Sequence, residues 1–128
     1  MKIVVTRIFV DDQAKAGTFY HHVLGFEPKQ DVPMGQHRWL TFTAPGDSHG
    51  VQLSLEPNLH PAASAFQTAL KADGLPAITF EVKHVEDEYR RLTEAGVEFV
   101  KPPTSDEGFI VAVFDDTCGN LVQLAQRH

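Results

Sequence analysis

Polar side chains recur at every second position in four segments of strand-forming residues, and they carry groups that commonly do chemistry. Side chains at alternate positions of a strand point to the same face of a sheet, so each series shares one face. The four series are Val5 and Arg7; His37, Trp39 and Thr41; Gln52, Ser54 and Glu56; and Ala77, Thr79 and Glu81. They predict a site for a polar organic molecule or a metal site in which His37, Glu56 and Glu81 are the conceivable ligands.

His37 and Trp39 each have a structural and a functional interpretation. His37 is either a histidine at the loop edge of a strand or a donor or general base that titrates near neutral pH. Trp39 is either a core residue or a surface on which a planar or apolar ligand stacks. The other histidines are interpreted as turn or surface residues.

Arg7 places a charge in the middle of a strand, where an unpaired charge rarely points into a core. The favoured interpretation is a salt bridge with Glu81 or with a second copy of the chain. The functional alternative is a group that binds an anion or a carboxylate. Cys118 is the only cysteine, which excludes an internal disulfide and a multi-cysteine zinc site, and it is interpreted as structural.

In the first half of the chain, hydrophobic periodicity predicts one helix among four strands. The helix follows a cap at Asp11 or Asp12, buries Ala16, Phe19, Tyr20 and Val23, and ends at Gly25. The strands are expected at Lys2–Val10, Phe26–Gln30, Trp39–Thr43 and Val51–Glu56.

The second half repeats this order after a linking helix over residues 61–73, which Gly74 and Pro76 end. A helix marked by Val85, Tyr89 and Leu92 is expected, together with strands at Ile78–Val82, Val97–Val100, Phe109–Phe114 and Leu121–Gln126. The stretch Lys101–Gly108 is rich in turn-forming residues and is predicted to be a mobile loop.

The two halves form an internal repeat, because Val51–Ser54 returns as Val122–Ala125 and both helices end at a glycine. The sequence therefore predicts an α+β fold of two βαβββ modules within a single domain, residues 1–128. Module one covers about residues 1–58 and module two about residues 76–128. A chain of this length has room for one core of ordinary size.

The acidic composition limits the partners. The chain of 128 residues has a formal net charge of −6, since 17 acidic residues outnumber 11 basic ones. That balance argues against nucleic acid and mildly against anionic membranes. No stretch approaches the roughly 20 apolar residues of a membrane-spanning helix, and Met1–Val5 is better interpreted as strand than as signal peptide, so a cytoplasmic location is expected.

Two segments carry a resemblance to a known family. Residues Phe9–Asp12 and Phe19–Phe26 resemble the module opening of the vicinal-oxygen-chelate superfamily, which includes glyoxalases, bleomycin-resistance proteins and extradiol dioxygenases. Residues Phe114–Leu124, with an acidic turn and a glycine before the strand, resemble its closing strand. The resemblance implies two curled four-stranded sheets around a cup, with the helices outside and usually a homodimer.

The resemblance also implies where a metal would bind. The family's ligand positions fall on Val5 and Gln52 in module one and on Ala77 and Gln123 in module two. Valine and alanine cannot ligate, and two glutamines make a poor site without an imidazole or a carboxylate. The chain is therefore expected to be a glyoxalase-like member that lacks the usual metal ligands and has no cofactor.

The leading hypothesis is a dimeric protein that binds a small organic molecule in its cup without a metal, similar to the bleomycin-resistance branch. The alternative is a metal-dependent lyase or dioxygenase of the same superfamily with non-standard ligands. A metal-free acid–base enzyme stays open, and no catalytic residue is assigned. The expected ligand-binding residues are Arg7, His37, Trp39, Gln52, Ser54, Glu56, Thr79, Glu81 and Gln123.

Overall fold

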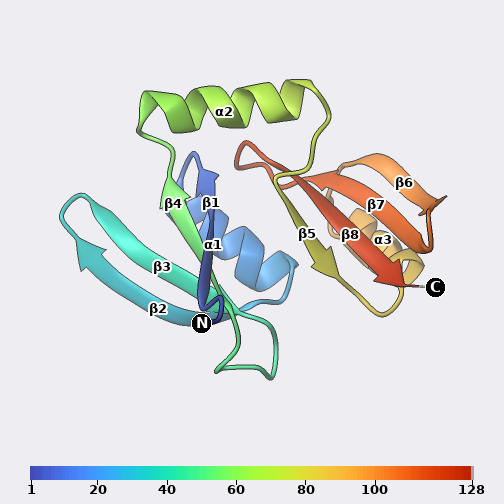
Figure 1. Cartoon of the computed structure of the whole chain (residues 1–128), viewed down its shortest axis with the longest axis horizontal. Helices are drawn as coiled ribbons and strands as arrows, with labels where there is room; N and C mark the ends of the chain where they lie inside the picture. The colour runs from blue at the N-terminus through green and yellow to red at the C-terminus, as the bar shows by residue number, and fades with distance from the viewer. Residues whose placement is uncertain (128) are drawn as a thin grey trace. The chain divides into compact units, whose positions relative to one another are not determined.

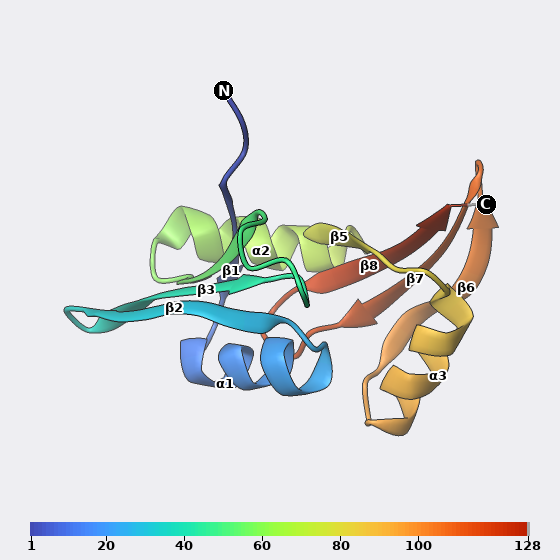
Figure 2. The ribbon, with the colours of Figure 1, turned by 90° about the horizontal axis from the view of Figure 1, so that it is seen from below.

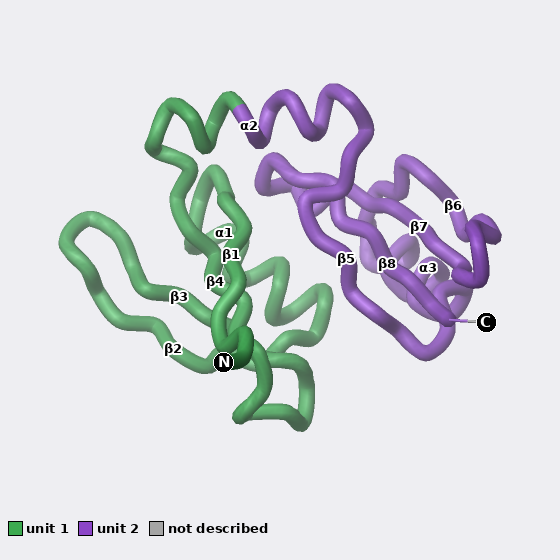
Figure 3. Tube along the Cα trace, viewed as in Figure 1, with its two compact units in different colours: residues 1–65 green, residues 66–128 purple. Residues whose placement is uncertain are grey.

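The computed structural model describes residues 1–127 and divides the chain into two compact units, residues 1–65 and residues 66–128 (Figure 3). Each unit contains one four-stranded sheet, and the element order repeats between them (Figure 1). This confirms the predicted α+β class and the two βαβββ modules. The prediction that residues 1–128 form one cooperative domain remains a prediction.

Unit one has the strand order β1-β4-β3-β2, in which β1 runs parallel to β4 and the other neighbours are antiparallel. A helical segment joins β1 to β2, which are the two edge strands of this sheet. Its elements are β1 (Val5–Val10), α1 (Gln13–Thr18), a π-helical turn η1 (Phe19–Val23), β2 (Glu27–Met34), β3 (His37–Thr43) and β4 (Gln52–Pro57).

Unit two repeats this topology with the order β5-β8-β7-β6. Helix α2 (Pro61–Ala72) crosses the boundary between the units, close to the predicted linking helix over residues 61–73. The further elements are β5 (Ile78–Glu81), α3 (Val85–Glu94), β6 (Phe99–Asp106), β7 (Phe109–Asp115) and β8 (Leu121–Arg127). No helix in residues 1–127 is long and apolar enough to cross a membrane.

The module helices begin where side chains satisfy their first N–H groups. Asp12 caps α1, since its Oδ1 accepts a hydrogen bond from the Lys15 N–H at 3.0 Å. Helix α3 has no such cap from its own His84; instead Gln126 of β8 accepts the Val85 N–H at 2.7 Å. Module one therefore anchors its helix by a local signal and module two by a contact from the sheet.

The prediction of a mobile loop over Lys101–Gly108 was wrong, because β6 continues through this stretch to Asp106. Pro102 and Pro103 cannot donate to a ladder, yet β6 lies at the edge of its sheet, where one side of the strand needs no partner. The register with β7 shifts between Lys101 and Thr104, so the prolines fall in an irregular stretch.

The largest other differences from the predicted strands lie at the end of β2 and at the start of β1. Strand β2 runs to Met34 rather than to Gln30, and it pairs with β3 along this length apart from a register shift between Pro28 and Gln30. Strand β1 begins at Val5 rather than at Lys2.

The core of unit one lies between its sheet and α1, which contacts β3 and β4 (Figure 2). The largest side chains there are Tyr20 and Phe42, which are 0% and 2% exposed. In unit two α3 contacts β6, β7 and β8, and Phe114 is fully buried. Each helix therefore covers one face of its own sheet, and the opposite face is not covered by that helix.

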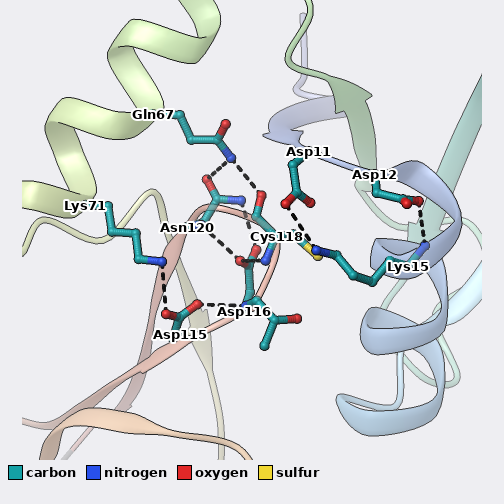
Figure 4. A network of polar contacts seen from close by, with 10 residues as sticks. Asp11, Asp12, Lys15, Gln67, Lys71, Asp115, Asp116, Cys118 and Asn120 are labelled. Atoms are coloured by element: carbon teal, nitrogen blue, oxygen red, sulfur yellow. Dashed lines mark hydrogen bonds and ion pairs between the residues drawn. The ribbon is translucent and has the colours of Figure 1, made fainter.

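A buried polar network holds the turn between β7 and β8 (Figure 4). The Asp116 carboxylate is 0% exposed and accepts hydrogen bonds from the N–H groups of Cys118 and Asn120 and from the Asn120 amide, at 2.7, 3.0 and 2.9 Å. Gln67 of α2 donates to the Cys118 carbonyl and to Asn120 Oδ1, at 3.0 and 3.2 Å. This network joins α2 to the sheet of unit two.

Candidate functional site

The face of the first sheet that points away from α1 gathers all six candidate residues of module one. Leu40, Leu55 and Phe42 belong to the face under α1, since a Cβ on Gly17 would contact Leu40 and Phe42. Alternation and the register pairs Val5–Gln52, Arg7–Ser54 and Thr41–Ser54 place the other series on the opposite face. That face, here called the binding face, contains Arg7, His37, Trp39, Gln52, Ser54 and Glu56, with Val5 and Thr41 among them.

Hydrogen bonds between side chains organise the binding face. Thr41 and Ser54 are both 0% exposed and face each other across β3 and β4. The Thr41 hydroxyl donates to Gln52 Oε1 at 2.7 Å, and the Ser54 hydroxyl donates to Glu56 Oε2 at 3.1 Å. Because these buried hydroxyls hold the half-buried side chains of Gln52 and Glu56 in fixed orientations, the two side chains form a preorganised polar surface.

Trp39 is half-buried on this face, and its indole N–H donates to Gln30 Oε1 of the neighbouring strand. The hydrogen bond fixes the ring, so the tryptophan is neither a fully buried core residue nor a freely moving one. Sequence reasoning did not include Gln30 or Thr41 among the candidate residues, although Thr41 alternates with Trp39 along β3.

The structure gives Arg7 a partner that the sequence did not predict, Glu56 of its own module. Arg7 Nε lies 3.5 Å from Glu56 Oε2, because Arg7 faces Ser54 and Glu56 follows two residues later on the same face. Glu81 instead pairs with Arg127, whose Nε lies 2.9 Å from Glu81 Oε2.

The two ion pairs occupy equivalent positions with their charges exchanged. Arg7 faces Ser54, and Glu81 faces Ala125, the counterpart of Ser54 in the second module. The partner follows two residues later in both modules, as Glu56 and as Arg127. Both modules therefore have an ion pair at this position, but the basic residue lies on the first strand in module one and on the last strand in module two.

The three candidate residues of module two also share one face of their sheet. Gln126 caps α3, so Gln126 and Leu124 lie on the face towards α3, and Gln123 and Ala125 lie on the opposite face. Thr79 faces Gln123, and its Oγ1 accepts a hydrogen bond from Gln123 Nε2 at 3.2 Å. Thr79, Glu81 and Gln123 therefore form the counterpart of the binding face.

Two shallow hollows border these residues. One, of about 410 Å³, lies beside Gln52 and is lined by the segment Lys2–Val4, by Lys29 and by residues 48–51. The other, of about 290 Å³, lies in unit two and is lined by residues 81–83 and by Gln126 and Arg127. Both are near the lower end of the size range of small-molecule pockets.

The four positions at which the family binds metal do not fit one here. Val5 faces Gln52 directly, so a metal at this point would meet one alkyl group and one amide whose oxygen already accepts the Thr41 hydroxyl. In unit two Thr79 and not Ala77 faces Gln123. Within residues 1–127 no group of three His, Cys, Asp or Glu side chains is placed to hold a metal ion.

The repeated βαβββ module and its strand order define a class of protein, and a comparison with known families identifies the same class. A family model described as the Glyoxalase/Bleomycin resistance protein/Dioxygenase superfamily matches residues 2–124. The chain belongs to this superfamily, as the resemblance of its module openings predicted.

Three relatives span nearly all of the chain. It is 53% identical over 127 residues to the uncharacterized protein YurT of Bacillus subtilis, covering 99% of this chain and 100% of YurT. The crystal structure of UcmS2 is 29% identical with a TM-score of 0.83, covering 98% of this chain and 97% of that one. TnmS3, an antibiotic binding protein from Streptomyces, is 24% identical with a TM-score of 0.77, covering 100% and 97%, and shares the fold.

Proposed function

We propose that this protein binds a small organic molecule, of the planar or amphipathic kind found among antibiotics, on its binding face and without a bound metal. The observation that carries the proposal is the preorganised pair of Gln52 and Glu56, held by the buried hydroxyls of Thr41 and Ser54, beside the fixed indole of Trp39. Such a surface combines an apolar ring with oriented hydrogen-bonding groups, which is the usual composition of a small-molecule site. TnmS3, which shares the fold, is described as an antibiotic binding protein.

The absence of a suitable donor set at the family's metal positions supports the metal-free form of the proposal. Chemistry in which a metal holds two adjacent substrate oxygens needs ligands that Val5 and Ala77 do not provide. We therefore assign Gln52 and Gln123 to hydrogen bonding with the ligand rather than to metal coordination.

A homodimer is part of the proposal. Strand β1 lies at an edge of its sheet, and the exposed apolar side chains of Ile3, Val4 and Val5 run along and before it. An unpaired edge flanked by apolar residues is commonly covered in an assembly. Light scattering after size-exclusion chromatography is expected to give twice the 14.2 kDa chain mass; a monomer mass at micromolar concentration would contradict the dimer.

Thermal unfolding with a compound panel tests the ligand. We expect at least one planar aromatic compound or cationic glycopeptide to stabilise chelator-treated protein; a ligand at roughly 100 times its dissociation constant contributes about 2.7 kcal/mol. Replacing Trp39 with Ala should weaken binding about tenfold, because the stacking surface is lost.

Phe66→Ala serves as the matched control, since it removes an exposed aromatic ring from α2 and should leave affinity unchanged. Zinc, nickel, manganese and ferrous iron are added separately to the same stripped protein. Stabilisation by one of these metals, with no organic compound active, would overturn the proposal in favour of the metal-dependent alternative.

A further inference from the structure

A second hollow in unit one lies on the opposite side of the sheet from the binding face. It has a volume of about 330 Å³ and is formed by α1 and η1 on one side and by β2 and β3 on the other. Leu40 and Phe42 give it apolar walls, and Arg38, Asp31 and the imidazoles of His21 and His22 give it polar ones. It contains none of the residues assigned to the proposed function.

The backbone of Arg38 is held firmly at this hollow, but one nitrogen of its guanidinium group, Nε, is left without a hydrogen bond. The amide of Gln13 bonds both sides of the Arg38 backbone, donating to its carbonyl at 2.7 Å and accepting its N–H at 3.1 Å. The nearest carboxylate oxygen, Asp31 Oδ1, lies 3.3 Å from Arg38 Nε, an ion-pair distance. Nε is nevertheless buried and has no hydrogen-bond partner in residues 1–127.

A buried donor without an acceptor is costly, so it requires an explanation in a folded protein. A guanidinium group is planar and presents paired N–H groups that match the two oxygens of a carboxylate. The charge of Arg38, the missing hydrogen bond of its Nε and the partial exposure of its side chain, 37%, therefore point to an anionic ligand.

Gly17 is a second and independent observation. It lies inside the continuous helical stretch of α1 and η1, where glycine is less stable than alanine. No contact explains it, because a Cβ there would lie 3.5 Å from Leu40, 3.7 Å from Arg38 Nη2 and 3.9 Å from Phe42, all ordinary packing distances. The missing methyl group instead leaves open the part of the hollow where Arg38, Leu40 and Phe42 meet.

The rim of the hollow is built by the π-helical turn. The imidazole of His21 is held by a hydrogen bond between Nδ1 and the Phe26 carbonyl oxygen at 2.8 Å, and its ring centroid lies 4.5 Å from that of His22. Asp31 is the only acidic side chain on the wall, and it already pairs with Arg38. A ligand in this hollow would meet one guanidinium group, two imidazoles and an apolar floor.

We propose that the hollow between α1 and strands β2 and β3 binds a small carboxylate with an apolar body, whose carboxylate group pairs with Arg38 and whose body lies on Leu40 and Phe42. Benzoate is a suitable probe, since it combines a planar carboxylate with a ring of the right size. Acetate lacks the apolar body, benzamide lacks the charge, and inorganic phosphate has the charge without a planar carboxylate.

The test is a titration of the full chain with benzoate, followed by NMR of backbone and side-chain resonances. We expect saturable shifts at Gly17, Arg38 and Leu40, with affinity at least tenfold lower for acetate, benzamide and phosphate. Shifts confined to Trp39 and Gln52 would place benzoate on the binding face and overturn the proposal, as would the absence of saturable shifts. Preference for phosphate would overturn the carboxylate assignment.

Gly17→Ala separates binding from folding. The variant should fold, and its melting temperature should be unchanged or raised by a few degrees, because alanine is more stable than glycine within a helix. It should nevertheless bind benzoate at least tenfold more weakly. Arg38→Gln should also lose at least tenfold, and Arg90→Gln, which removes an equivalent charge from an exposed ion pair of α3, should lose nothing. Unchanged affinity in a folded Gly17→Ala protein would overturn the proposal.

Discussion

Replacing Asp116 with Ala is expected to lower the free energy of unfolding by about 3 to 5 kcal/mol. The carboxylate is fully buried, and it accepts three hydrogen bonds from Cys118 and Asn120. Alanine would leave those three N–H donors without their acceptor in a place that water does not reach. Two of the donors are backbone N–H groups, whose directions are fixed by the turn.

Urea unfolding followed by circular dichroism measures the loss. Asp115→Ala is the matched control, because it removes the neighbouring carboxylate, which is 24% exposed, pairs with Lys71 at 3.0 Å and accepts one hydrogen bond, from the Thr117 N–H at 2.8 Å. A pair of this kind contributes about 1 kcal/mol or less. Equal destabilisation by the two variants would contradict the role assigned to the buried network.

Gln67→Ala tests the same network from the helix. Gln67 is 6% exposed and donates to the turn rather than to the carboxylate, so the expected loss is smaller, about 1 to 2 kcal/mol. The order Asp116, Gln67, Asp115 in decreasing effect follows from burial and from the number of hydrogen bonds lost.

The sequence predicted the fold because its strongest signals are local and occur twice. Strand alternation and glycine helix ends depend on neighbouring residues only, and the repeat supplied two observations of each. The same alternation placed Gln52, Ser54 and Glu56 correctly on one face, and the register pairs added Arg7 and Thr41 to it.

The errors arose where the answer depends on position in the sheet. Lys101–Gly108 resembles a loop by composition, and its prolines are compatible with a strand only because β6 is an edge. The partner of Arg7 depends on the β1–β4 register, and a residue pattern within one strand does not determine a register with another. The role of Gly17 is hidden for a similar reason, since the sequence does not show which side chains would meet its Cβ.

The exchanged ion pairs show what the repeat can and cannot predict. Duplication of a module conserves backbone geometry, so Arg7 with Glu56 and Glu81 with Arg127 occupy matching positions. Either arrangement of charge satisfies the same geometry, and therefore the fold does not select between them. The repeat therefore does not predict the charges on the face of one module from those on the other.

Replacing Phe114 with Ala in unit two is expected to destabilise unit one as well. Truncation of a fully buried phenylalanine costs about 3 to 5 kcal/mol, and Phe114 is 0% exposed. A domain of about 60 residues is marginally stable on its own, and helix α2 runs without interruption across the boundary between the two units. We therefore expect a single cooperative transition, as the prediction of one domain over residues 1–128 requires.

The only tryptophan, Trp39, reports on unit one, so its fluorescence distinguishes the two cases. In a single transition, Phe114→Ala lowers the urea midpoint of Trp39 fluorescence as much as Phe42→Ala, which removes the matching ring from unit one, where it is 2% exposed. If the units unfold separately, Phe114→Ala leaves the fluorescence midpoint at its original value while hydrogen exchange in residues 66–127 accelerates. That second result would show that each βαβββ module holds its own core, and would make two independently folding units the correct description of the chain.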